Sequence, residues 1–281
     1  MVEPATVNSE ISFLTFGAGT PKWVGTAQRL GRSALRSNQF ATVEVSGWET
    51  LQRDHPKFCE RYAAMLQSDV KGFGYWIWKP LLIRSALVES KGFLLYLDGG
   101  SMLNLRTAAA NVRLLQYLER AKTVGAVMME LEQPEWKWNK ADSVERLGLT
   151  PEHLASPQMM AGVLLLRRTS EIVDLIDSWL EIVLESSHRF VDDSPSRLPE
   201  HHGFCEHRHD QAILSGLAKL AGINPISDET HFGGDWLRLG SDYPIWTTRF
   251  RGTSDLRLQL RLARKGSSPT MGELARWFLR S

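Results

Sequence analysis

The feature that most constrains the fold is a short apolar segment that ends in an acid and two glycines. Residues 93–97 read Phe-Leu-Leu-Tyr-Leu, an uninterrupted apolar run of the kind found in central strands that are buried on both faces. Asp98 follows directly, and Gly99 and Gly100 then allow the backbone to turn and a ligand to come close. Because ligands of open α/β sheets bind beyond the carboxyl ends of the strands, Asp98 is the first candidate functional residue.

The N-terminal part of the chain predicts the sheet to which this strand belongs. Residues 11–16 (Ile-Ser-Phe-Leu-Thr-Phe) read as a first strand that is closed by the glycine turn at 17–19. Thr20 and Pro21 then begin a helix that runs to about Ser37, and residues 40–45 form a second strand. A strand, a helix and a strand joined by short connections predict a mostly parallel α/β sheet.

The alternation continues to about residue 250. We expect helices within 48–66, over 79–88, 107–120 and 169–184 and from Asp210 onward, and strands over 124–129 and 158–167. Segments 130–140 and 187–203 are polar and aperiodic and are predicted to be loops. Helical spacing places on buried faces Val112, Leu115, Leu118, Ile213, Leu214, Leu217 and Leu220.

Composition limits the class of protein. A hydrophobic content of 43% and a charged content of 23% over 281 residues are ordinary for a globular α/β domain. The net charge of +1 gives no case for a nucleic-acid partner, and no apolar stretch approaches the roughly 20 residues of a membrane span. The two cysteines, Cys59 and Cys205, form no zinc-type pair, and the first residues do not resemble a signal sequence, so a reduced cytoplasm is the expected compartment.

The predicted organisation is one domain over residues 1–254 followed by a basic, leucine-rich tail over 255–281. In the tail Leu256, Leu258, Leu260 and Leu262 alternate with polar residues, as in a strand, whereas Ser254 is a typical helix cap, so strand and helix both remain open. A third interpretation is peripheral contact of this tail with a membrane that carries lipid-linked glycans.

Two motifs carry a resemblance to a known family. Residues 72–80 read Gly-Phe-Gly-Tyr-Trp-Ile-Trp-Lys-Pro, and residues 95–100 read Leu-Tyr-Leu-Asp-Gly-Gly. Together they resemble bacterial glycosyltransferase-like proteins of the GT-A, nucleotide-sugar-transferase fold, in which an Asp-x-Asp motif holds a divalent metal and a sugar nucleotide. Here Gly100 stands in place of the second Asp. If residues 76–78 are extended, Trp76 and Trp78 point to opposite sides.

Weaker similarities to the same family lie further along the chain. The strand at 158–167 begins with Gln158 and contains Gly162, and it resembles a strand of glycogenin-like enzymes in which such a glycine lets the acceptor sugar approach. His209-Asp210-Gln211 resembles a helix start found in many GT-A enzymes, and the His-x-x-Gly spacing from His231 resembles a C-terminal histidine motif. The resemblance implies a hexosyltransferase with a Rossmann-like sheet flanked by helices, which uses a nucleoside diphosphate sugar, UDP-linked, and a glycan or lipid-linked glycan acceptor.

Sugar transfer sets two chemical tasks. The departing diphosphate needs its charge neutralised, for which Mn²⁺ or Mg²⁺ on carboxylate ligands is suited, and the acceptor hydroxyl must lose a proton. We expect Asp98 to serve as a catalytic residue and metal ligand with His209 and His231, or with His207, unless a lysine or arginine replaces the metal, and Asp210 to take the proton or to orient the acceptor. The residues expected to bind nucleotide or substrate are Tyr75, Trp76, Lys79, Gly99, Gly100, Lys140, Gln158, Gly162, Arg208, Gln211 and Arg249.

Two other classes of function fit parts of the pattern. A non-catalytic protein that binds nucleotide sugars or carbohydrates would have kept the fold and lost the metal chemistry, and Gly100 favours this alternative. A nucleotidyltransferase has a similar sheet but normally carries a basic, glycine-rich first loop for a triphosphate. Lys22 is the cation nearest to the turn at 17–19, which makes the nucleotidyltransferase the weaker alternative.

Overall fold

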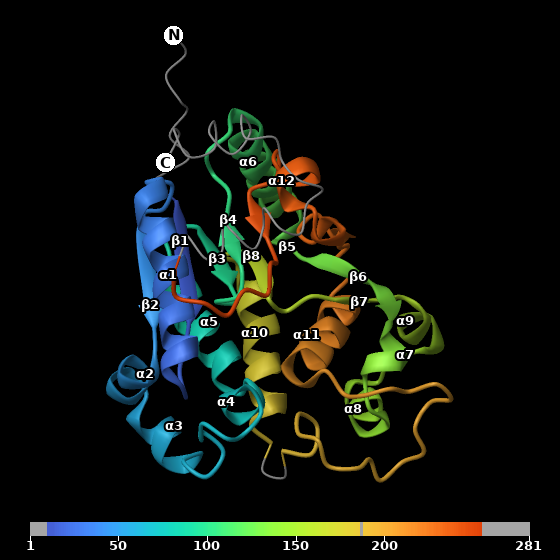
Figure 1. The fold of residues 1–281 in the computed structure, drawn as a ribbon. Coiled ribbons are helices and arrows are strands. Elements are labelled where there is room, and N and C mark those ends of the chain that lie inside the picture. Colours follow the sequence, from blue (N-terminus) through green and yellow to red (C-terminus); the bar gives the residue numbers. More distant parts are fainter. Residues whose placement is uncertain (1–9, 186–187, 255–281) are drawn as a thin grey trace.

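A central sheet with the strand order β2-β1-β3-β8-β5 organises the computed structural model, which describes residues 10–185 and 188–254 (Figure 1). Its strands are β1 (Ile11–Phe16), β2 (Thr42–Ser46), β3 (Phe93–Leu97), β5 (Ala126–Val127) and β8 (Val163–Arg167). The predicted tail at 255–281 lies outside the described residues, so its structure and its membrane contact stay predictions.

The sheet is mostly parallel, as the sequence predicted. β1 pairs in parallel with β2 and with β3. β8 is antiparallel both to β3 and to β5, so that β5 runs in the same direction as β3. One reversed strand in an otherwise parallel sheet brings the turn before β8 to the carboxyl end of β3.

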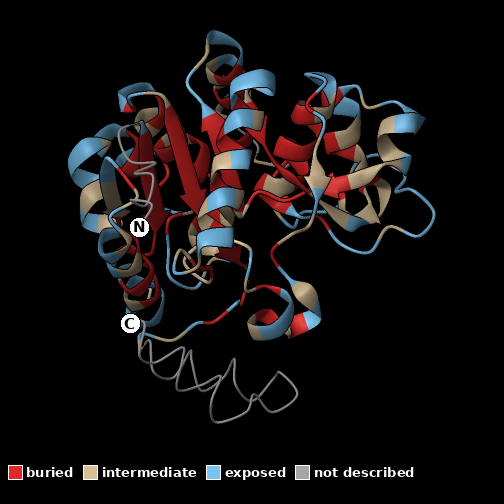
Figure 2. Ribbon diagram, turned by 90° about the horizontal axis from the view of Figure 1, so that it is seen from above, coloured by how far each residue is buried: buried red, intermediate tan, exposed pale blue. Residues whose placement is uncertain are grey.

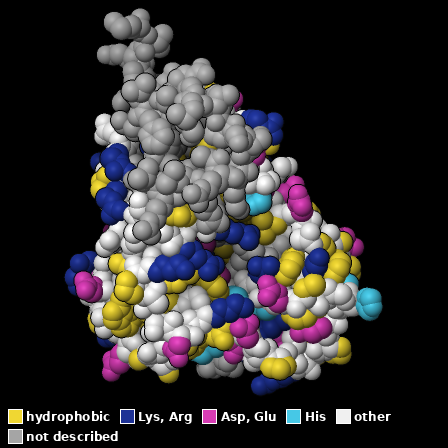
Figure 3. Space-filling model, viewed as in Figure 1, with side chains coloured by type: hydrophobic (Ala, Val, Ile, Leu, Met, Phe, Trp, Pro, Cys, Tyr) yellow, Lys and Arg dark blue, Asp and Glu magenta, His cyan; other side chains and the backbone are white. Residues whose placement is uncertain are grey.

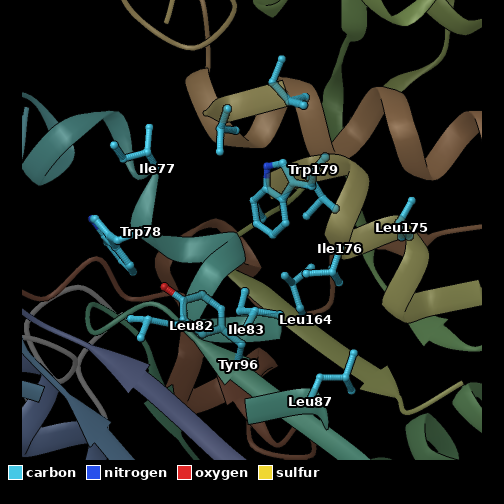
Figure 4. Close-up of a cluster of buried hydrophobic side chains, with 14 of the residues drawn as sticks. Ile77, Trp78, Leu82, Ile83, Leu87, Tyr96, Leu164, Leu175, Ile176 and Trp179 are labelled. Atoms are coloured by element: carbon cyan, nitrogen blue, oxygen red, sulfur yellow. The ribbon is translucent and has the colours of Figure 1, made fainter. Parts of the chain in front are cut away.

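Helices cover both faces of the sheet because alternate strand residues point to opposite sides. On one face, Leu14, Leu94 and Leu164 pack with α5 (Trp78–Glu89), α10 (Ser170–Val183) and α11 (His209–Leu220). On the other, Phe13, Leu95 and Leu165 pack with α1 (Pro21–Ser37) and α6 (Ala108–Val124). Figure 2 shows the buried sheet between helices whose outer surfaces are exposed, and Figure 4 shows the close packing of α5 and α10 side chains over Leu164 and Tyr96.

Local signals in the sequence placed two helices correctly. α1 begins at Pro21, directly after Thr20, whose backbone is extended. It ends at Ser37, and the backbone of the next residue, Asn38, is in the left-handed region. At the start of α10 the Thr169 hydroxyl accepts a hydrogen bond from the Ile172 amide, and the apolar face of this helix (Ile172, Leu175, Ile176 and Trp179) is buried.

Smaller elements complete the described chain. They are α2 (Trp48–Asp54), α3 (Pro56–Arg61), α4 (Gly72–Tyr75), β4 (Met102–Leu103), β6 (Met129–Pro134), α7 (Glu135–Trp138), α8 (Ala141–Leu147), α9 (Pro151–Ala155), β7 (Pro157–Met159), β9 (Ile226–Ser227), η1 (Phe232–Gly234), α12 (Trp236–Leu239) and β10 (Ile245–Trp246). β4 pairs with β10, and β6 lies between β7 and β9 in a third sheet. None of the helices in the described ranges has the length and apolar character to cross a membrane.

Several expectations about these elements were wrong. The segment 130–140 is not a loop, because β6 pairs with β7 and α7 follows at once. The single strand expected over 158–167 is divided into β7 and β8, which belong to different sheets. Val112 and Leu220, which were expected on buried faces, are 53% and 46% exposed. α6 is buried through Leu114, Tyr117 and Leu118, and α11 is buried through Ile213 and Leu214 as expected but not at its last residue.

Candidate active site

The strand β3 delivers Asp98 to the carboxyl edge of the sheet. The Asp98 amide donates to the Gly162 carbonyl at 2.9 Å, which ties the end of β3 to the turn before β8. The Tyr96 hydroxyl donates to Asp98 Oδ1 at 2.7 Å from among the apolar side chains of the core (Figure 4). The Asp98 side chain is nevertheless 45% exposed. Its carboxylate is therefore held by Tyr96 on the core side and open to a ligand on the solvent side.

A buried lysine lies between Asp98 and a second carboxylate. Lys79, in the first turn of α5, has a side chain that is only 3% exposed. Its Nζ atom is 3.3 Å from Asp98 Oδ1 and 2.9 Å from Asp210 Oδ2. The three groups form what we call the central triad: Asp98, Lys79 and Asp210.

The environment of the central triad changes the acidity of its members. Burial raises the pKa of Asp210 to about 6, although contact with Lys79 opposes this rise. Burial also lowers the pKa of Lys79, but the two carboxylates outweigh this effect and leave its pKa above the ordinary value. Lys79 is therefore a fixed cation, and Asp210 is a carboxylate that can change charge near neutral pH.

Asp210 is held in place by the start of α11. The Trp179 indole donates to the Asp210 carbonyl at 3.0 Å. Gln211 accepts a hydrogen bond from the Ala161 amide at 3.3 Å and donates to Gln158 at 2.7 Å. The turn at 160–162 is thus bonded both to the Asp98 backbone and to the residue after Asp210, which sets the spacing of the two carboxylates.

Residues 72–76 of the aromatic motif form a left-handed turn rather than an extended segment, and α5 begins at Trp78. Trp78 is buried in the core, whereas Trp76 is half-buried. Every residue from Gly72 to Trp76 has a positive φ, with values of 55° at Phe73, 52° at Tyr75 and 61° at Trp76. Non-glycine residues in this region are strained by about 1 kcal/mol or more each. Such strain is concentrated at functional sites, where the surrounding structure holds an unfavourable conformation in place.

The left-handed turn places its rings against His209. The imidazole lies 5.2 Å from the ring of Tyr75 and 5.5 Å from that of Trp76, and His209 itself has a φ of 52°. The ring nitrogen Nδ1 donates to the Val191 carbonyl at 2.7 Å. Burial lowers the pKa of His209, so the imidazole is neutral at physiological pH and fixed in one tautomer.

The three residues predicted as metal ligands do not assemble into a site. Within the parts of the chain that the structure describes, no group of three or more His, Cys, Asp or Glu side chains is arranged to hold a metal ion. His231 packs edge-on against Trp236, and His207 is occupied by the Phe190 carbonyl. Asp98 and Asp210 are the two carboxylates that do converge, and the Lys79 ammonium occupies the space between them, so this pair does not fit a bridging metal ion either.

The turn after Asp98 is braced by a buried arginine that the sequence did not single out. Arg29 of α1 donates through Nη2 to the carbonyls of Gly99 and Ser101, at 3.0 and 2.9 Å. On the other side, the Thr248 hydroxyl donates to the Gly100 carbonyl at 2.9 Å, and the exposed Arg249 packs its backbone against Gly100. Figure 3 shows Lys and Arg side chains gathered in the middle of this face.

Gly162 is at its position because Asp98 leaves no room for a side chain. A Cβ atom on Gly162 would lie 2.8 Å from Asp98 Oδ2, closer than side chains approach one another. The sequence predicted that Gly162 lies at a ligand site, and the structure places it in contact with Asp98.

Other residues predicted to bind substrate make internal contacts. Lys140 is buried and donates to the Asp192 carbonyl and carboxylate and to the Ser194 carbonyl. Arg208 lies 4.1 Å above the ring of Trp138 and pairs with Glu206. Gln158 is fully buried between Gln211 and Glu135. The binding role predicted for these residues stays a prediction.

Glu135 is a buried acid that sequence reasoning missed. Its carboxylate accepts hydrogen bonds from Asn139, Gln158, Ser215 and Lys219, which come from α7, β7 and α11. The Lys219 ammonium lies 2.7 Å from Glu135 Oε2. No pattern in the predicted loop at 130–140 distinguished this glutamate from its exposed neighbours.

Comparisons with known proteins add the following. No protein-family model matches the chain, and no curated protein matches it. Among solved structures, the chain is similar to the crystal structure of mouse xyloside xylosyltransferase 1 in its apo form. The two share 12% sequence identity and a TM-score of 0.42, and the match covers 85% of this chain and 97% of that chain.

Proposed function

We propose that this protein is a glycosyltransferase that transfers a hexose from a nucleoside diphosphate sugar, UDP-linked, to a hydroxyl group of a glycan. The sequence resemblance at 72–80, 95–100 and 207–211 supports this class, and these segments meet in the folded chain around Lys79, Asp98 and Asp210. Asp98 follows the last residue of β3, and ligands of open α/β sheets bind beyond the carboxyl ends of such strands.

The observation that carries the proposal is the convergence of Asp98 and Asp210 on Lys79 at this edge. Cleavage of a bond between an anomeric carbon and a phosphate oxygen develops positive charge on the sugar and negative charge on the diphosphate. Carboxylates next to the sugar and cations next to the diphosphate lower the energy of that state. The central triad and Arg29, whose guanidinium binds the carbonyls of the turn at 99–101, provide both kinds of charge.

The carboxylates of Asp98 and Asp210 differ in their exposure to solvent, and we assign them different roles on this basis. Asp98 is open to a ligand, whereas the Asp210 side chain is 5% exposed and its Oδ2 contacts Lys79. We therefore assign contact with the reacting groups to Asp98. Its Oδ2 takes the acceptor proton as the acceptor oxygen bonds to the anomeric carbon and the carbon–oxygen bond to the diphosphate breaks. Asp210 acts through Lys79 as a positioning residue.

A hydrolysis and transfer assay with a set of sugar nucleotides tests the proposal. Asp98→Asn should lower turnover by at least about a hundredfold, the scale of lost proton transfer, while the melting temperature stays close to that of the wild type. Asp69→Asn, in an exposed loop, is the matched control and should leave turnover unchanged. Full turnover by Asp98→Asn with an intact fold would remove the proposed role of this carboxylate.

A second function is favoured by Gly100, which replaces the second acid of the Asp-x-Asp pattern. A non-catalytic protein that binds nucleotide sugars would retain the site and lack turnover. Calorimetric titration with UDP and with sugar nucleotides, run beside the transfer assay, separates the two functions. Binding without hydrolysis or transfer of any donor supports the binding protein.

A further inference from the structure

The two carboxylates of the central triad already have a cation between them. Lys79 Nζ touches one oxygen of each carboxylate, and its side chain is buried almost completely. Its ring neighbours are Trp76 and Tyr96, whose centroids lie 5.9 and 5.6 Å from Nζ. A divalent ion that bridged Asp98 and Asp210 would have to displace this ammonium into an apolar and aromatic environment, which is costly for a charge.

The turn beyond Asp98 is also supplied with positive charge by the chain. Arg29 donates to the carbonyls of Gly99 and Ser101, and the backbone of the exposed Arg249 packs against Gly100. The charged groups of Lys79 and Arg29 balance the two carboxylates Asp98 and Asp210 without any other ion. A diphosphate at this turn therefore meets basic side chains of the protein itself.

We propose that the ammonium of Lys79 takes the place of a divalent metal ion at the Asp98–Asp210 pair, and that the site binds a nucleoside diphosphate without such an ion. The second half of this statement rests on the proposed function. The first half concerns only the chain and is tested without any nucleotide.

Mn²⁺ titration of the nucleotide-free protein, followed by electron paramagnetic resonance, tests the first half. Wild type should show no saturable binding up to about 1 mM, whereas Lys79→Met, which leaves two carboxylates without a cation, should bind one Mn²⁺ at least about tenfold more tightly. Lys79→Arg keeps the positive charge and should behave like the wild type. Lys140→Met removes another buried lysine, one that faces a single carboxylate, and should gain no Mn²⁺ site.

Gly100→Asp is a second variant that does not remove a buried charge. A Cβ atom at Gly100 has its nearest contact at 3.4 Å, with the Arg249 backbone, so the fold accommodates a side chain there. The variant places an acid two residues after Asp98 with no lysine between them, and it should also gain Mn²⁺ binding. Saturable binding of one Mn²⁺ by the wild type that Asp98→Asn abolishes would overturn the inference, as would an absence of binding in both Lys79→Met and Gly100→Asp.

UDP titration in chelator and in Mn²⁺ tests the second half. The Kd of the wild type should change by less than about twofold between the two conditions. Lys79→Met should bind UDP about tenfold more weakly in chelator and regain affinity in Mn²⁺, a rescue that a merely structural role of Lys79 would not produce. A tightening of wild-type binding by tenfold or more in Mn²⁺ overturns the inference. Failure to bind any nucleoside diphosphate in either condition rejects the proposed function instead and leaves the nucleotide-free result intact.

Discussion

The ammonium of Lys79 lies 2.9 Å from the carboxylate of Asp210, although the two residues belong to helices that are far apart in the sequence. Lys79 is in the first turn of α5 and Asp210 is in the first turn of α11. Both are buried, so neither group would be stable there without the other. The contact therefore fixes how the starts of the two helices meet. The same ammonium also lies 3.3 Å from Asp98 Oδ1.

The first prediction concerns pH. Burial raises the pKa of Asp210 to about 6 from its ordinary value of 3.8, so the folded state holds this proton more tightly than the unfolded state does. Its contribution to stability is full below pH 3.8 and is lost as the pH rises through about 6. The free energy of unfolding of the wild type minus that of Asp210→Asn should therefore fall by about 2 kcal/mol between pH 4 and pH 7.

Denaturant unfolding of both proteins at several pH values measures this difference. Taking the difference cancels the other carboxylates, such as Asp192, whose pKa is lowered in spite of burial by bonds from Ser194 and Lys140 and which changes stability in the opposite direction. A difference that stays level from pH 4 to pH 7 would show that Asp210 has an ordinary pKa.

The second prediction concerns the close approach of Gly162 to Asp98. In Gly162→Ala the new methyl group would lie 2.8 Å from Asp98 Oδ2 and would push the carboxylate from its anchored position. Transfer activity should fall at least about tenfold, because a displacement of this size disturbs catalytic geometry, while stability changes by less than about 2 kcal/mol. Gly92→Ala, whose added atom has its nearest contacts at 3.6 Å, is the control and should keep full activity.

The third prediction isolates the backbone strain in the left-handed turn. Tyr75→Gly and Tyr75→Ala lose the same ring contact with His209, but only glycine adopts the φ of 52° without strain. Tyr75→Gly should therefore be more stable than Tyr75→Ala by about 1 kcal/mol in chemical unfolding. At Val112, on the exposed face of the right-handed helix α6, the order should reverse, with alanine more stable than glycine by about the same amount.

The fourth prediction concerns the buried acid Glu135. Glu135→Gln presents an amide to groups that all donate hydrogen bonds, and it leaves the buried Lys219 ammonium without its partner. The free energy of unfolding should fall by about 3–5 kcal/mol. Glu132→Gln, at an exposed position of β6 just before α7, should change it by less than about 0.5 kcal/mol. Equal stabilities of the two variants would show that Glu135 is not essential to the packing of α7 against α11.

The strands that the sequence predicted well are those with unbroken apolar runs. The bounds of β1 and β3 agree with the prediction, because a segment buried on both faces is apolar at every position. The segment 158–167 was predicted less well. It has no polar residue between Met159 and Leu166, but the division into β7 and β8 depends on pairing with strands that lie far away in sequence.

The residues of the candidate site also divide into those with a local sequence signal and those whose position depends on distant parts of the chain. Asp98 and Asp210 were identified from their places after a strand and at a helix start, which are local signals. The left-handed turn was missed because Phe73, Tyr75 and Trp76 do not favour positive φ, and only their packing against His209 and the core holds them there. Arg29 and Glu135 were missed because ordinary helix and loop positions give no sign of long-range partners.

The sequence by itself determined the alternation of strands and helices, the starts of α1 and α10, and the acid at the end of β3, since each depends on neighbours within a few residues. The tertiary structure decided that Lys79 lies between Asp98 and Asp210 and that Gly162 makes room for Asp98. A buried charged side chain pairs with the opposite charge that the packing of distant elements brings close to it. The spacing of residues along the chain does not predict which side chain that is.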